Sequence, residues 1–269
     1  MMRHSRIALT LCLVALLIFP VIQPGDGSVE AHASGQAAQQ QITVAAAISM
    51  KDVLQALEKR FSERSGAPKV AFDFGASGIL QKQIEQGAPI DVFISAAPAQ
   101  MNALEEKGLL LAGTRRNIAG NRLVLVVPAG SFAVKQVADL SKPEVHVIAL
   151  GEPRSVPAGQ YAAEALKNLG LFDALKSKFV YAQDVRAVLT YVSERDADAG
   201  FVYETDAKST DKVTIAAPLP ATSYTGIIYP GAVIRNSPNA TAAKSFFEFL
   251  TSADARSIFE QFGFTPPAK

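Results

Sequence analysis

The sequence predicts an α/β fold in which strands and helices alternate and pack as mostly parallel sheets covered by helices. Short apolar runs, typical of buried strands, are followed repeatedly by segments whose apolar residues recur at helical spacing. Small residues fill many of the turns that join a strand to the next helix. Apolar residues make up 49% of the 269 residues and charged residues only 19%, which is a globular composition.

The N-terminal segment 1–33 has the features of a cleaved export signal. Arg3 and Arg6 precede an apolar run at 7–19 that is short for a membrane span. The small-x-small tripeptide that ends at Ala33 predicts cleavage there, followed by a flexible polar leader at 34–41. Cleavage removes the only cysteine, which suits an oxidising compartment.

A strand at 42–44 begins the regular structure of the mature chain, and a helix follows it. Ser49 and Asp52 are the start signals that we expect for this helix, because short polar side chains cap free N–H groups there. The alternation then repeats, with further strands expected at 69–74, 91–95 and 123–127 and further helices at 79–84 and 99–107.

The same alternation continues to the C-terminus. Strands are expected at 145–150, 179–181, 199–203, 213–215 and 227–234. Helices are expected after Pro157, after Asp184, at 241–250 and at 253–262. Pro230 and Gly231 lie inside the last strand, and since proline cannot donate to a sheet ladder they predict an edge strand or an irregular crossing strand.

Several functional classes lack their usual residues in this chain. Lysine plus arginine number 26 against 25 acidic residues, so no basic footprint for nucleic acid is present. No glycine-rich phosphate or dinucleotide loop follows a strand. His146, the one histidine of the mature chain, is expected within an apolar strand, which leaves little for histidine-based catalysis or Cys/His metal sites. The sequence leaves open a catalytic pair of carboxylates, but it predicts no enzyme, no cofactor and no direct metal ligand.

Four turns that lead into helices share a different chemistry. They contain Ser49, Ser77, the segment 156–159 and the segment 183–186. Ligands of such sheets bind beyond the carboxyl ends of the strands, where the first helical N–H groups lack partners and the helix dipole favours anions. Taken singly, each turn is more simply explained as an N-cap or a tight packing turn. Together they predict a site for a small, anionic solute.

These turns and their flanking residues also resemble a known family. The likeness covers the segments 42–50, 75–78, 87–96, 151–153, 156–162, 164–166, 184–186, 200–203 and 258–264. In this order they are similar to periplasmic molybdate-binding proteins, the solute receptors of molybdate ABC importers. Each segment alone is weak evidence, but the combination spans essentially the whole mature chain and is specific.

The resemblance implies a clamshell fold of two α/β lobes joined by two crossing hinge strands. Lobe 1 would comprise 42–122 plus 226–269, and lobe 2 would comprise 123–225. The ligand would lie between the lobes, held by hydroxyls and backbone amides without a charged side chain.

The resemblance also implies the binding residues. Ser49 and Ser77 would donate hydroxyls, Ala158 and Val185 would donate backbone N–H groups, and Tyr203 would donate its phenol. Two further positions depart from the family pattern: Ile48 stands where a small residue is expected, and Gly78 stands where a hydroxyl residue is common.

By this resemblance the protein is expected to capture molybdate or tungstate through the oxygens of the anion and to pass it to the membrane permease of an ABC importer. It is expected to act in the periplasm, as a monomer. A receptor for sulfate, thiosulfate or phosphate is the alternative. An iron receptor is disfavoured because the chain has no Tyr-Tyr pair, and an exported transferase or hydrolase on the same scaffold is a further alternative, because fold does not fix function.

Overall fold

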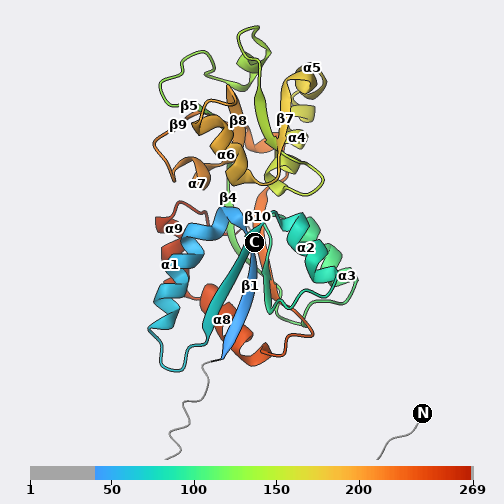
Figure 1. Ribbon diagram of the computed structural model, residues 1–269, viewed down its shortest axis with the longest axis vertical. Helices are drawn as coiled ribbons and strands as arrows, with labels where there is room; N and C mark the ends of the chain where they lie inside the picture. The colour runs from blue at the N-terminus through green and yellow to red at the C-terminus, as the bar shows by residue number, and fades with distance from the viewer. Residues whose placement is uncertain (1–39, 268–269) are drawn as a thin grey trace, which may run out of the picture. The chain divides into compact units, whose positions relative to one another are not determined.

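The computed structural model describes residues 40–267 (Figure 1). The predicted signal peptide and most of the predicted leader lie outside these residues. Between residues 40 and 267, none of the helices combines the length and the hydropathy that a bilayer span requires.

The first sheet has the strand order β2-β1-β3-β10-β4. Its strands are β1 (Gln41–Ala47), β2 (Lys69–Gly75), β3 (Val92–Ile94), β4 (Arg116–Asn121) and β10 (Ile227–Val233). β1 pairs in parallel with β2 and β3, whereas β10 runs antiparallel to β3 and β4. All strands except β10 therefore point the same way, as a mostly parallel sheet requires. This sheet and its helices are called lobe 1 below.

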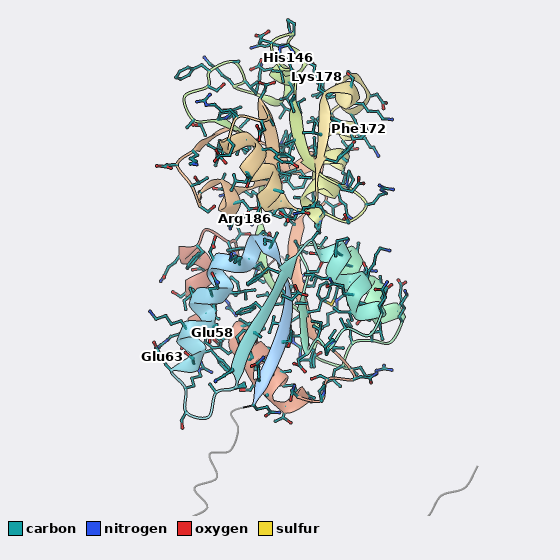
Figure 2. All side chains as sticks on the ribbon, viewed as in Figure 1. Glu58, Glu63, His146, Phe172, Lys178 and Arg186 are labelled. Carbon is teal, nitrogen blue, oxygen red and sulfur yellow. The ribbon has the colours of Figure 1, made fainter. Side chains whose placement is uncertain are left out.

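The helices of lobe 1 lie on both faces of its sheet (Figure 1). They are α1 (Lys51–Ser62), α2 (Ser77–Glu85), α3 (Pro98–Glu106), α8 (Ala240–Leu250) and α9 (Ala253–Gln261), with a 3-10 turn η1 (Ile48–Met50) before α1. α1 buries Leu57 and Phe61 on its apolar face, and the Phe61 ring packs 5.1 Å from that of Phe246 in α8. Glu58 and Glu63 lie towards the C-terminal end of α1 (Figure 2).

The second sheet has the strand order β7-β6-β8-β5-β9. Its strands are β5 (Leu123–Pro128), β6 (Ile148–Gly151), β7 (Phe179–Ala182), β8 (Ala199–Tyr203) and β9 (Val213–Pro218). Here β5 is the strand that runs against its neighbours β8 and β9, while β6 pairs in parallel with β7 and β8. This sheet and its helices are called lobe 2.

The helices of lobe 2 follow its strands along the chain. They are α4 (Pro157–Asn168), α5 (Phe172–Leu175), α6 (Val185–Ser193) and α7 (Glu204–Ala207), with 3-10 turns η2 (Val137–Ser141), η3 (Lys176–Lys178) and η4 (Ala221–Ser223). β5 is buried over its whole length and is rich in valine and leucine, as expected of a strand covered on both faces.

The chain passes between the sheets twice. β4 ends at Asn121 in lobe 1 and β5 begins at Leu123 in lobe 2, and the segment 219–226 returns the chain from β9 to β10. The predicted α/β fold of two lobes joined by crossing strands is therefore confirmed. The residue boundaries of the lobes stay a prediction.

Two local predictions differ from the structure, and a third agrees with it in one of its two alternatives. β4 was not expected. β10 is not an edge strand, since it lies between β3 and β4, but it is irregular, with a register shift at Tyr229/Pro230. That shift accommodates Pro230, whose carbonyl oxygen still accepts from the Ser95 N–H at 2.9 Å. His146 precedes β6 and is exposed. It is not part of the strand, because its backbone N–H donates to Asp198 Oδ2 at 2.7 Å and not to a neighbouring strand.

Candidate anion-binding site

All five residues predicted to bind the ligand line one small cavity. Ser49 lies in η1, Ser77 begins α2, Ala158 and Val185 lie in the first turns of α4 and α6, and Tyr203 ends β8. Lobe 1 therefore supplies the two serines, and lobe 2 supplies the other three residues. None of the five is more than 3% exposed, so the cavity is enclosed.

The cavity is tight and uncharged. Its free volume is only about 10 Å³, far below the roughly 300–1,000 Å³ of pockets for drug-sized ligands. Apart from the five predicted residues its lining is apolar and mostly small: Ala47, Ile48, Gly75, Ala76, Ala96, Val156 and Pro157. None of the described lining residues is charged, so only hydroxyls, amides and helix dipoles can act on a guest.

The Ser77 hydroxyl is held by lobe 1 as an acceptor. Its oxygen accepts from the backbone N–H of Ala96 at 3.0 Å, and α2 has no side-chain cap at its N-terminus. The explanation of Ser77 as an ordinary N-cap is therefore wrong. Because its oxygen is already engaged, the hydroxyl proton is available to a guest.

The Ser49 hydroxyl belongs to a buried chain of side chains. Its oxygen lies 3.1 Å from the Tyr229 hydroxyl, and Asn121 Nδ2 donates to Tyr229 at 3.3 Å and to Thr205 Oγ1 at 2.9 Å. An amide nitrogen can only donate, so the Tyr229 oxygen accepts, and its own proton is free to point to Ser49. This arrangement leaves the Ser49 hydroxyl able to donate into the cavity. Ser49 does not cap α1, whose N-cap is Met50.

The backbone donors come from two helix N-termini of lobe 2. Ala158 is the second residue of α4 and Val185 the first of α6, positions whose N–H groups have no partner within the helix. Asp184 caps α6 by accepting from the Ala187 N–H at 2.8 Å, as its place in the sequence predicts. Gly159 lets α4 start directly against β6, because a Cβ there would collide with the backbone of Gly151.

Tyr203 completes the set of donors. Its hydroxyl is buried and has no hydrogen-bond partner among the described residues. Burial, with the neighbouring Tyr229 as a further cause, raises the pKa of the Tyr203 phenol well above its usual value. The phenol therefore stays protonated at physiological pH and can act as a donor. A tyrosine that merely filled the core would be expected to find a partner for its hydroxyl.

The two residues that depart from the family pattern lie in different places relative to the cavity. Ile48 lines the cavity and contributes to its small size. Gly78 does not line it. The N–H of Gly78 donates to the carbonyl oxygen of Ser155 in lobe 2 at 2.9 Å.

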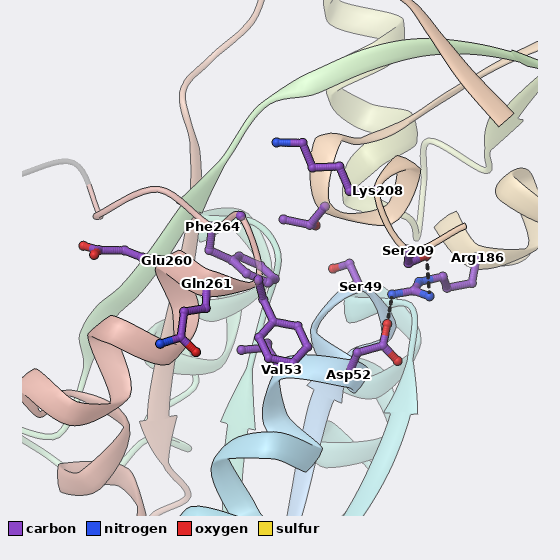
Figure 3. A pocket seen from close by; sticks show the side chains of 12 residues that line it. Ser49, Asp52, Val53, Arg186, Lys208, Ser209, Glu260, Gln261 and Phe264 are labelled. Carbon is purple, nitrogen blue, oxygen red and sulfur yellow. Dashed lines mark hydrogen bonds and ion pairs between the residues drawn. The ribbon is translucent and has the colours of Figure 1, made fainter. Parts of the chain in front are cut away.

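A larger hollow of about 530 Å³ lies beside the cavity and shares Ser49 with it (Figure 3). The lining of this hollow includes charged side chains, among them Arg186. Arg186 pairs with Asp52 of α1 at 2.6 Å and with the buried Asp206 of α7 at 2.7 Å. Arg186 directly follows Val185, yet its side chain pairs with two acidic residues that do not line the small cavity.

The described residues offer no group of three or more histidine, cysteine, aspartate or glutamate side chains that could hold a metal ion.

Sequence reasoning missed Tyr229, Asn121 and the Gly78–Ser155 contact. Tyr229 and Ser49 are 180 residues apart, and Asn121 and Tyr229 are 108 apart. No local motif could have joined them. The motif 184–186 did include Arg186, but its pairing across the lobes depends on Asp52, which is 134 residues away.

Known proteins are similar to this chain over nearly all of its described residues. The family model for bacterial extracellular solute-binding proteins matches residues 42–265. The molybdate-binding protein ModA of Haemophilus influenzae is 39% identical over 235 residues, which are 85% of this chain and 91% of that protein. ModA of Escherichia coli is 37% identical over 229 residues, which are 83% and 88% of the two chains.

A solved structure is similar as well. The periplasmic molybdate-binding protein of Azotobacter vinelandii has a TM-score of 0.77 at 26% identity, and the match covers 84% of this chain and all of that one. Since the family model spans nearly all the described residues, the chain belongs to the family of bacterial extracellular solute-binding proteins.

Proposed function

We propose that this protein is an extracytoplasmic receptor that captures molybdate, and also tungstate, and delivers it to an ABC importer. The observation that carries this proposal is the enclosed, uncharged cavity into which Ser49, Ser77, Ala158, Val185 and Tyr203 converge from both lobes. Relatives at 37–39% identity carry the name molybdate-binding protein.

The donors suit a fully deprotonated oxyanion. The oxygen of Ser77 already accepts from Ala96, so Ser77 offers its proton. The Ser49 hydroxyl, which lies beside Tyr229, is able to donate too. An anion that still carries a proton, such as hydrogen phosphate, would bury a donor without an acceptor, which costs about 1–3 kcal/mol. Phosphate is therefore disfavoured relative to a dianion without protons.

Neutral donors are sufficient to hold a dianion here. The N-termini of α4 and α6 each carry a partial positive charge of roughly half a unit. Enclosure lowers the local dielectric constant, which strengthens each hydrogen bond to the charged guest. A cage of fixed donors also measures size. Sulfate has the shape and charge of molybdate but is smaller, whereas tungstate is nearly equal to molybdate in size.

The proposed location and partner follow from the same assignment. We expect the signal to be cleaved near Ala33 and the mature monomer to act in the periplasm, where it meets the membrane permease subunit of the importer. Closure of both lobes on the anion gives the permease a shape to recognise. A receptor for sulfate or thiosulfate remains the competing assignment.

Thermal unfolding of the mature chain tests the proposal. A ligand that binds only the folded state stabilises it by about 2.7 kcal/mol at a hundredfold excess over Kd. We expect molybdate and tungstate to raise the unfolding temperature to a similar extent, and equal sulfate to have little effect. A larger shift with sulfate would reassign the ligand and leave the fold untouched. No shift with any of the three anions would contradict an oxyanion receptor.

A further inference from the structure

The enclosed cavity can be filled only if the lobes separate. Every predicted donor is at least 97% buried in the described structure, so an anion of several atoms has no path to them while the lobes are in contact. How closely the lobes approach after the anion enters then decides whether donors from both sides reach it together. The contacts between the lobes at the edge of the cavity are therefore part of the binding geometry.

One of these contacts is between two backbones. The N–H of Gly78, in the first turn of α2, donates to the carbonyl oxygen of Ser155 at 2.9 Å. A Cβ at position 78 would meet that oxygen at 2.7 Å and the Ser155 Cα at 2.8 Å. Real Cβ atoms do not come this close to other heavy atoms, and a backbone cannot rotate out of the way as a side chain can. Only glycine permits the observed spacing.

The contact also joins the two turns that carry Ser77 and Ala158. Gly78 directly follows Ser77, and Ser155 lies three residues before Ala158. Ser77 and Ala158 both belong to short, buried turns that begin helices. Any widening at Gly78–Ser155 therefore moves the Ser77 hydroxyl away from the Ala158 N–H.

We propose that Gly78 is a specificity-determining residue, because it sets how closely Ser77 of lobe 1 and Ala158 of lobe 2 approach across the bound anion. This inference rests on the proposed function and goes further, since Gly78 neither lines the cavity nor touches the guest. A side chain at this position destabilises the closed arrangement of the lobes and leaves the separated arrangement unchanged. It weakens binding, and it weakens the binding of a smaller anion more than that of a larger one.

The test is Gly78→Ala in the mature chain, with Gly226→Ala as the matched control. The φ angle of Gly78 is not in the left-handed region, and a Cβ at Gly226 would meet nothing within 4 Å, so both variants are expected to fold. Isothermal calorimetry with molybdate should give a Kd for Gly78→Ala that is at least about fivefold above wild type, the lower end of what overpacking costs. Gly226→Ala should bind like wild type.

Two further measurements separate this role from a simple loss of stability. The unfolding temperature without ligand should be unchanged or higher in Gly78→Ala, because alanine favours helix over glycine. Where the affinity for sulfate is measurable, it should fall by a larger factor than the affinity for molybdate. Small-angle X-ray scattering at saturating molybdate should show a larger radius of gyration for the variant than for wild type.

The outcomes distinguish the role of Gly78 from the proposed function on which that role rests. Wild-type protein that binds molybdate, together with Gly78→Ala of equal affinity, would overturn the role of Gly78 alone. Equal losses for Gly78→Ala and Gly226→Ala would overturn it too. A wild-type chain that binds neither molybdate nor tungstate would overturn the proposed function, and this inference with it.

Discussion

The two serines of the site show that hydrogen-bond partners decide what a residue does. Ser49 and Ser77 both stand at helix starts, where a hydroxyl normally caps the helix. Neither does so, because Ser77 accepts from Ala96 and Ser49 lies against Tyr229. The Ser77 oxygen is engaged within lobe 1, so its proton is left for a guest and its hydroxyl is oriented before the anion arrives. The Ser49 hydroxyl can donate to a guest as well.

Ser77→Ala tests this orientation. The variant loses one hydrogen bond to a charged guest, so molybdate affinity should fall by roughly 1–3 kcal/mol, or about five- to 150-fold in Kd. It also leaves the Ala96 N–H without its acceptor, so the unliganded fold should lose some stability. Calorimetry well below the unfolding temperature measures the affinity separately. The exposed Ser62→Ala is the control, and an unchanged affinity for Ser77→Ala would remove this serine from the site.

At the scale of the elements, α6 and α7 are joined by an ion pair whose two side chains differ in burial. Asp206 is wholly buried in α7, whereas the side chain of its partner Arg186 is 25% exposed. The second oxygen of Asp206, Oδ2, has no hydrogen-bond partner among the described residues. Burial raises the pKa of Asp206 to about 7, although the charge of Arg186 opposes the shift. The helix pair therefore holds a carboxyl group that binds a proton more tightly when folded than when unfolded.

This carboxyl group predicts how stability depends on pH. Between the unfolded pKa of about 4 and the folded value of about 7, the folded state keeps a proton that the unfolded state has lost. The free energy of unfolding should therefore fall as pH rises through this window, by at most about 1.4 kcal/mol per pH unit. Urea denaturation from pH 5 to pH 7 measures the slope.

Asp206→Asn should remove most of this slope, whatever it does to absolute stability, because an amide does not titrate. The exposed Asp173→Asn is the matched control. A slope that persists in Asp206→Asn would assign the pH dependence to other groups. The carboxyls whose pKa is lowered, such as Glu85 and Glu204, act at lower pH, because their stabilisation is lost only as pH falls below about 4.5.

At the scale of the whole molecule, polar contacts join the lobes around the cavity. They include the Gly78–Ser155 backbone bond, the Arg186–Asp52 ion pair at 2.6 Å, the Asn121–Thr205 hydrogen bond at 2.9 Å and a long Gln100–Gln160 contact at 3.5 Å. The ion pair is partly exposed, so it is worth at most about 1 kcal/mol.

Asp52→Asn tests the contribution of this ion pair to closure. It should weaken molybdate binding by up to about fivefold at low salt, because the closed state loses an attraction that the open state lacks. The difference should shrink at high salt, since the Debye length falls to about 3 Å at 1 M. Glu58→Gln is the control, as Glu58 lies further along the same helix from Arg186 (Figure 2). A salt-independent loss would assign Asp52 a different role.

The sequence predicted most elements because their patterns are local. The helix at 185–193 could be recognised from its apolar spacing and from Asp184, which caps it as expected. β4 could not be recognised, because its sequence RNIAGN has no strand pattern and becomes a strand only by pairing with β10. Pro230 predicted an edge strand or an irregular crossing strand, and the second alternative fits, because a register shift admits Pro230 in the middle of the sheet. Tyr203 was found through family likeness and not through its own pattern.

The sequence by itself determined the alternating elements and the small, uncharged turns from which a neutral cage is built, because helix starts and apolar periodicity depend on near neighbours. Only the tertiary structure decided which protons face the guest, why position 78 is glycine, and why the Arg186 charge lies outside the cavity. Each of those depends on partners from another element or the other lobe, such as Tyr229, Ser155 and Asp52. Their positions are fixed by the packing of two sheets and not by any local pattern.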